Sequence, residues 1–409
     1  MKRILITIGM ILAAAIIVNA QSTDAFLEIS GRITDQKTKK VLPQSSVYIK
    51  GGDIGTVANN SGEFILKVPK EFVKGQLVAS SVGYAIFEID MSKISGDFID
   101  IELVPVVVIM DEIVVRDVNS ILNEALKKKN ENYPLEYQVM TSFFRETVRK
   151  NRSYIDVSQG IISVNKSAYD TNSKDQMNIV KGSRVQNYKK EDTLAFKVMG
   201  GPNTMLMLDV VKNPGVVLHK DIFSYYKYEL KDVKMVNNRR TYEISFKPKA
   251  IYDFVLYTGL LYIDVESFAV SGLSFGYGEQ YLKTAGSDMI KKKPTFAKLT
   301  PTRVHYDVKY RSIGNKWYLD YVRNEIDMKC NWKKKLFNSN FSSVSEMVVT
   351  EKSSSTETNF SKNSITRSSD IFSEKVGGFY SIDFWENYSI IKPEDDLRKA
   401  LAKIEKKKN

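Results

Sequence analysis

Cysteine and histidine are scarce in this chain: its 409 residues include one cysteine and two histidines. Cys330 has no partner for an intrachain disulfide, so the fold must be stabilised by burial, and Cys330 itself is expected to be a small buried side chain. His219 and His305 match neither the H-E-x-x-H nor the H-x-x-E spacing of zinc peptidases. A phosphate-binding glycine loop is also lacking, and we predict no metal and no cofactor.

The first twenty residues have the composition of a secretory signal peptide. Lys2 and Arg3 precede an apolar stretch over 4–18, and Val18-Asn19-Ala20 offers a small-residue cleavage site. The apolar stretch is shorter than the roughly 20 residues that span a bilayer. We therefore expect cleavage after residue 20 and an exported protein, periplasmic or associated with the outer membrane, without a transmembrane span.

The chain is basic, with a net charge of +12 at pH 7. The lysines and arginines are spread along the sequence, whereas a nucleic-acid-binding protein would concentrate them on one element. Nucleic acid is therefore not an expected partner. A solvated basic surface is the simplest explanation, and contact with an anionic membrane surface or lipopolysaccharide is the alternative.

Four turn motifs divide residues 29–84 into short alternating strands. Each contains Gly, Pro, Asn or Asp at the turn, as joined β-strands require. Gly62 supplies a residue that tolerates positive φ before Phe64 re-enters the core. The motifs are Ser30-Gly31-Arg32-Ile33-Thr34-Asp35, Leu42-Pro43-Gln44-Ser45-Ser46-Val47, Gly55-Thr56-Val57-Ala58-Asn59-Asn60-Ser61-Gly62 and Ser81-Val82-Gly83-Tyr84.

The order of these motifs resembles the carboxypeptidase-like regulatory domain, a transthyretin-like, seven-stranded β-sandwich. The resemblance covers residues 27–105, with Ala58-Asn59 in place of the usual Thr-Asp. It implies a structural or docking module without catalytic residues.

Longer elements follow the sandwich. Residues 106–133 are expected to be a connector with a short helix at 120–129, for which Ser120 is a candidate N-cap. Residues 134–391 contain long alternating strands rich in Tyr, Val, Ile and Phe, which predict a large, curved, half-barrel-like antiparallel sheet with few helices. Residues 392–409 are expected to form a charged helix. The predicted fold class is therefore mainly β.

The hairpin over 259–270 resembles a signature hairpin of bacterial lipoprotein carriers, which shelter acyl chains on the concave face of a half-barrel. In this hairpin Leu261, Ile263 and Val265 share one face, while the opposite face carries Asp264. We therefore predict that Leu261, Ile263 and Val265 point inward and face a ligand. Candidate covers for this face are the connector helix, the aromatic segment 379–388 or a bound lipid.

Two patterns raise the question of catalysis. Gly272-Leu273-Ser274-Phe275-Gly276 matches the G-x-S-x-G nucleophile elbow, but it lies inside an alternating strand, where the elbow requires a sharp strand-to-helix turn. Asp264 and Glu266 can share a strand face, yet they lie at a hairpin end where acidic turn residues are common. No catalytic residue is predicted, and a hydrolase that uses Ser274 is the alternative.

Two short segments are candidates for other interactions. Asp111, Glu112, Ile113, Val114 and Val115 resemble the segment that energy-transducing receptors offer to a periplasmic partner by strand addition, although a plain interdomain strand is the favoured explanation. Asp192-Thr193-Leu194 fits an O-glycosylation signal of some Gram-negative periplasms.

The sequence thus predicts a non-enzymatic, exported envelope protein that binds a protein partner or an acyl or lipid ligand through its β domains. The alternatives are the Ser274 hydrolase and an outer-membrane-associated component that docks on an energy-transducing receptor system.

Overall fold

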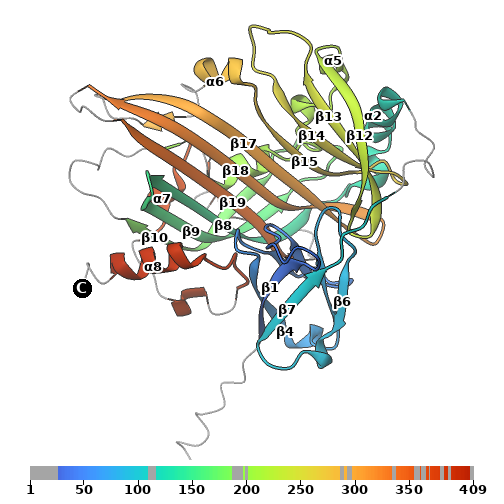
Figure 1. Ribbon diagram of the computed structural model, residues 1–409, viewed down its shortest axis with the longest axis vertical. Helices are drawn as coiled ribbons and strands as arrows, with labels where there is room; N and C mark the ends of the chain where they lie inside the picture. Colours follow the sequence, from blue (N-terminus) through green and yellow to red (C-terminus); the bar gives the residue numbers. More distant parts are fainter. Residues whose placement is uncertain are drawn as a thin grey trace, which may run out of the picture.

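A computed structural model describes residues 26–108, 117–186, 197–198, 201–285, 290–292, 297–333, 338–353, 360, 365–367, 369–377, 382–385 and 388–405. Their strands form sheets of three, four and ten strands and one two-stranded pair. The prediction of a mainly-β fold is therefore confirmed. Figure 1 shows the two smaller sheets at one end of the molecule and the large sheet extending away from them.

The two small sheets form the predicted seven-stranded sandwich. Alternate side chains of β4 are buried, as a strand with one face on a core requires. Gly62 has φ +73°, and a Cβ there would lie 2.6 Å from the Ile33 carbonyl oxygen, so this turn requires glycine. The strands are β1 (Phe26–Asp35), β2 (Ser46–Ile49), β3 (Gly55–Val57), β4 (Glu63–Pro69), β5 (Gln76–Ser80), β6 (Phe87–Asp90) and β7 (Phe98–Leu103).

The large sheet is antiparallel, with the strand order β10-β9-β8-β19-β18-β17-β15-β14-β13-β12. Strand β19 is the last of these strands along the chain but lies in the middle of the sheet. It pairs with β18 on one side and with β8 on the other, so it joins the early and late parts of the chain. The strands are β8 (Gln138–Lys150), β9 (Ser153–Lys166), β10 (Gln176–Gln186), β12 (Tyr226–Val236), β13 (Arg239–Pro248), β14 (Tyr257–Asp264), β15 (Val270–Tyr277), β17 (Ala297–Ile313), β18 (Lys316–Trp332) and β19 (Ser339–Ser353). A short pair, β11 (Lys197–Val198) and β16 (Ile290–Lys292), lies apart from it.

The helices are few and short, and none that the structure describes is long and apolar enough to cross a membrane. The connector helix begins at Val118 and not at Ser120, because the Asp117 side chain accepts a hydrogen bond from the Ser120 backbone N–H and caps the helix. The helices are α2 (Val118–Lys127), α3 (Lys129–Asn132), α4 (Pro202–Met207), α5 (Lys220–Phe223), α6 (Glu279–Ala285), α7 (Phe372–Lys375) and α8 (Asp395–Glu405).

The two faces of the large sheet have different covers. We call the face that carries Leu261, Phe275 and Tyr306 the inner face; it belongs to the largest apolar core. The opposite, outer face carries Phe143 and Tyr321, which pack against Val57 of the sandwich and against Trp385 and Ile391 near the C-terminus. The aromatic segment 379–388 was a candidate cover for the inner face; its described residues Phe384 and Trp385 instead pack on the outer face.

A buried ion cluster holds the parts of the outer face together. The Glu346 carboxylate lies 3.0 Å from the Arg145 guanidinium and 2.5 Å from that of Arg323, and it accepts a hydrogen bond from the Tyr321 hydroxyl at 2.8 Å. Arg145 also donates to the Ile391 carbonyl oxygen at 3.1 Å. Because a charge buried without partners is strongly unfavourable, Glu346 and its partners fix how the C-terminal segment lies on the sheet.

This cluster predicts a specific loss of stability in acid. Burial by itself would raise the pKa of Glu346, but Arg145, Arg323 and Tyr321 hold it at about 2, below the usual 4.5. The stabilisation is therefore complete above about pH 4.5 and is lost as the pH falls towards 2. We expect the free energy of unfolding, measured by urea denaturation, to fall by about 3 kcal/mol more across this window than in Glu346→Gln. Equal pH dependence of the two proteins would contradict the assignment.

Candidate ligand-binding site

The inner face of the sheet is apolar across β14, β15 and β17. Leu261 and Ile263 are fully buried there, in the same core as Leu273 and Phe275 of the neighbouring strand. Val265 follows the end of β14 and is half-buried against this core. The structure therefore brings the three predicted residues to one core; that they contact a ligand remains a prediction.

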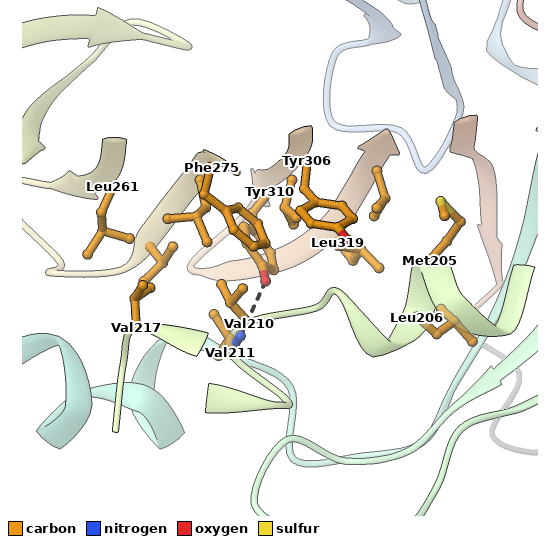
Figure 2. Packing of buried hydrophobic residues seen from close by; sticks show 14 of the residues in the cluster. Met205, Leu206, Val210, Val211, Val217, Leu261, Phe275, Tyr306, Tyr310 and Leu319 are labelled. Atoms are coloured by element: carbon orange, nitrogen blue, oxygen red, sulfur yellow. Dashed lines mark hydrogen bonds between the residues drawn. The ribbon is translucent and has the colours of Figure 1, made fainter. Parts of the chain in front are cut away.

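The segment 202–223 covers this face. Met205 of α4, followed by Val210, Val211 and Val217, lies against the strand side chains (Figure 2), and Leu206 belongs to the same core. The connector helix also contributes, because Ile121, Leu122 and Ala125 of α2 are buried in the same core. The connector helix, one of the predicted covers, therefore does cover this face. The segment 202–223 was not predicted as a cover, because its apolar residues follow neither a strand nor a helix period.

Asp209 anchors this covering segment. Its carboxylate is fully buried and lies 2.8 Å from the Lys166 ammonium, which also contacts Asp175 at 2.7 Å. The hydroxyls of Tyr169 and Tyr310 donate to the two carboxylate oxygens of Asp209, at 2.9 and 2.7 Å. The Tyr310 hydroxyl in turn accepts a hydrogen bond from the Val211 backbone N–H at 3.3 Å (Figure 2).

The charges in this cluster compensate one another. Burial by itself would raise the pKa of Asp209, but Lys166 and the two tyrosine hydroxyls hold it below its ordinary value. Burial would likewise lower the pKa of Lys166, but Asp209 and Asp175 raise it. Both groups therefore stay charged, and the pair fixes the covering segment on strands β9 and β17.

A cavity of about 360 Å³ remains between α2 and the covering segment. We call it the α2 cavity. Its volume lies in the range of small-molecule sites. Its wall is mostly apolar, with Lys129, Tyr133, His219, Lys220 and Asp221 as its charged or titratable residues, and burial lowers the pKa of Lys129. The apolar side chains in its lining are Ala125, Leu126, Val210, Val211, Pro214, Leu218 and Val270.

The structure brings His305 and Asp307 to Ser274, on the outer face. Ser274 lies within strand β15, as its alternation predicts, and its hydroxyl donates to Asp307 Oδ1 at 2.7 Å. His305 Nε2 lies 3.2 Å from the Ser274 hydroxyl and 3.3 Å from the same carboxylate oxygen. The sequence could not show this proximity, because it depends on the register between β15 and β17.

This arrangement differs from a catalytic triad. In a triad one ring nitrogen of histidine faces the serine and the other donates to the acid. Here Nε2 of His305 faces both groups, and the serine donates directly to the carboxylate. Burial by itself would raise the pKa of Asp307, but His305 and Ser274 hold it below its ordinary value. Asp307 is therefore a weak base for a serine nucleophile.

The remaining candidate residues from the sequence take part in ion pairs or in core packing. Asp264 is fully buried and forms a two-pronged ion pair with Arg239, at 2.6 and 2.8 Å, while Glu266 lies 3.5 Å from the same guanidinium. The two carboxylates thus flank an arginine. Cys330 is buried in the core, as expected. No group of three or more potential metal ligands occurs in the described part of the chain.

Two candidate segments lie outside the described residues. These are the strand-addition segment Asp111, Glu112, Ile113, Val114 and Val115, and the glycosylation signal around Thr193.

Comparison with known proteins identifies the sandwich. Residues 29–115 match the CarboxypepD_reg-like domain family. The resemblance to the carboxypeptidase-like regulatory domain, inferred from the turn motifs, is therefore confirmed for this part of the chain. No curated protein matches the sequence.

Several solved structures are similar to the chain. MucB in complex with MucA(peri) is 10% identical over 56% of this chain and 94% of its own, with a TM-score of 0.18. A domain described as outer membrane lipoprotein-sorting, from Vibrio parahaemolyticus, is 9% identical over 60% and 96%, with a TM-score of 0.25. A LolA superfamily protein from Nitrosomonas europaea is 11% identical over 62% and 99%, with a TM-score of 0.23.

The orientation of the β14 hairpin can be tested by adding a charge to each face. Ile263 is fully buried, so Ile263→Lys places an ammonium in the apolar core. We expect the free energy of unfolding to fall by about 3 kcal/mol or more. Tyr262→Lys on the opposite, half-buried face is the matched control, with an expected loss of about 1 kcal/mol. Urea denaturation measures both, and equal losses would contradict the orientation.

Proposed function

We propose that this chain is an exported, non-enzymatic binding protein that takes an acyl chain or lipid into the α2 cavity. The observation that carries the proposal is the cavity itself: about 360 Å³ with a largely apolar lining and two lysines, Lys129 and Lys220. Such a site offers burial to a hydrocarbon chain and an ammonium to a carboxylate or phosphate head group.

The surroundings of the cavity support an elongated apolar ligand. Val210, Val211 and Leu218 belong both to the cavity wall and to the covering segment, so the inner face of the sheet begins directly behind them. A ligand that displaces part of this segment would reach further apolar surface. The signal-like residues 1–20 support export, and the regulatory-like sandwich supports a docking role for the N-terminal part.

Filling the cavity should remove ligand binding. Ala125→Phe adds an aromatic ring to the cavity wall, and we expect the affinity for a fluorescent fatty acid to fall at least about tenfold, since the ring occupies the space of several methylene groups. Asn123→Phe adds the same ring to the exposed face of α2 and is the matched control.

Fluorescence titration of the two variants measures the effect. The same loss in both, or wild-type affinity in Ala125→Phe, would contradict the site. Mass spectrometry of lipids extracted from protein purified from its native envelope would identify the natural ligand.

The proposal also requires that Ser274 does no chemistry. Its hydroxyl already donates to Asp307, and the His305 Nε2 atom that lies near it also faces that carboxylate, so we expect Ser274→Ala to leave any ester or peptide hydrolysis by the purified protein unchanged. Steady-state rates with ester and peptide substrates check this. Abolished turnover in a variant with unchanged thermal unfolding would establish the hydrolase instead.

A further inference from the structure

The end of the large sheet that lies away from the sandwich has an unusual surface. At the other end of the β12–β13 hairpin, Asn237 accepts a hydrogen bond from the Ser80 hydroxyl at 2.5 Å, and Met235 accepts one from the Gly83 backbone N–H at 2.7 Å. Because that end contacts the sandwich, the opposite end of the hairpin points away from it. Figure 1 shows α5, which precedes β12, at this far end.

Apolar side chains are exposed here. In the loop between β13 and β14, Ile251 is 76% exposed and Phe254 is 47% exposed. Scattered apolar residues are normal on a protein surface, but these two belong to one group with Tyr225 and Tyr252. The Tyr225 ring centroid lies 5.0 Å from that of Tyr252 and 5.2 Å from that of Phe254.

The group is held in place by hydrogen bonds as well as by ring contacts. The Lys249 backbone N–H donates to the Tyr225 carbonyl oxygen at 2.8 Å, and the Tyr252 backbone N–H donates to the Tyr281 hydroxyl at 3.1 Å. Ile251 and Phe254 therefore stay exposed on an ordered support, and binding through them would need little further ordering of the loop.

Positive charge surrounds these side chains. Lys227 and Lys247 are directly opposite each other across β12 and β13, and both are exposed. Like charges in such a pair are unfavourable. Within the described ranges neither ammonium forms a direct ion pair, although both, after Lys231, help to lower the pKa of Glu229 on β12. Lys249 is a third exposed lysine here, while Asp253 is the acidic residue of the loop. An anionic partner would relieve the repulsion between Lys227 and Lys247.

We infer that this end, which we call the aromatic rim (Tyr225, Lys227, Lys247, Lys249, Ile251, Tyr252 and Phe254), docks on an anionic lipid bilayer. Ile251 and Phe254 enter the boundary between head groups and acyl chains, while the lysines contact lipid phosphates. Aromatic rings beside lysines match the composition of membrane interfaces. Lys220, at the start of α5, lines the α2 cavity, so docking would bring this cavity close to the membrane. The inference does not depend on which ligand the cavity takes.

Flotation of the full chain with vesicles tests the inference. We expect binding to vesicles of phosphatidylcholine with phosphatidylglycerol, weaker binding in high salt, and little binding to phosphatidylcholine alone. The double variants Ile251→Ser/Phe254→Ser and Lys227→Glu/Lys247→Glu should each lower the partition coefficient by at least about tenfold. Thermal unfolding verifies the fold of each variant: it should be unchanged in the lysine variant and only slightly lowered in Ile251→Ser/Phe254→Ser, because the Phe254 ring packs on Tyr225.

Matched controls come from the sandwich side of the chain. Lys37→Glu/Lys40→Glu reverses two exposed lysines there, and Val107→Ser removes a side chain that is 89% exposed; both should bind vesicles like the wild type. Phe254→Trp should show a blue-shifted emission with anionic vesicles. The inference is overturned if the wild type does not bind anionic vesicles; the aromatic rim would then be a surface for a protein partner. It is also overturned if the rim variants bind like the controls, or if the tryptophan emission does not shift.

Discussion

The buried pair of Lys166 and Asp209 determines how the inner face of the large sheet is covered. Asp209 belongs to the covering segment and pairs with Lys166 at the end of strand β9, and the Tyr310 hydroxyl on β17 donates a 2.7 Å hydrogen bond to the same carboxylate. Removing one member of a buried ion pair costs roughly 3–5 kcal/mol, because the other charge is left without compensation. The α2 cavity exists because this anchor holds the segment while leaving space beside α2.

The outer face is organised by the same principle. Glu346 compensates Arg145 and Arg323, and Arg145 reaches the C-terminal segment through the Ile391 carbonyl oxygen. The sandwich contacts the same segment, since the Asn59 side chain donates to the Lys392 carbonyl oxygen at 3.1 Å. An open sheet with two partly apolar faces must be covered on both, and here each cover is fixed by one buried carboxylate. The exposed aromatic rim lies where the covering segment leads into β12.

Local patterns predicted the sandwich, the connector helix and the mainly antiparallel character of the large sheet. The sandwich followed from its turn residues, as the positive φ of Gly62 illustrates. The burial of Leu261 and Ile263 followed from alternation, because a strand directs successive side chains to opposite faces. The covering segment was missed because its burial depends on Asp209, and nothing in the sequence around Asp209 indicates that Lys166 is its partner.

The sequence by itself determined where strands and turns occur, because backbone conformation and side-chain alternation depend on residues close together in the chain. Only the tertiary structure decided which segment covers which face, and that His305 and Asp307 lie beside Ser274. It also decided that Lys227 and Lys247 face each other next to exposed aromatic rings. These features depend on pairings between distant strands: Arg145 and Glu346, for example, are 201 residues apart in the sequence. Such pairings are selected by the burial of the whole sheet, and no local pattern encodes them.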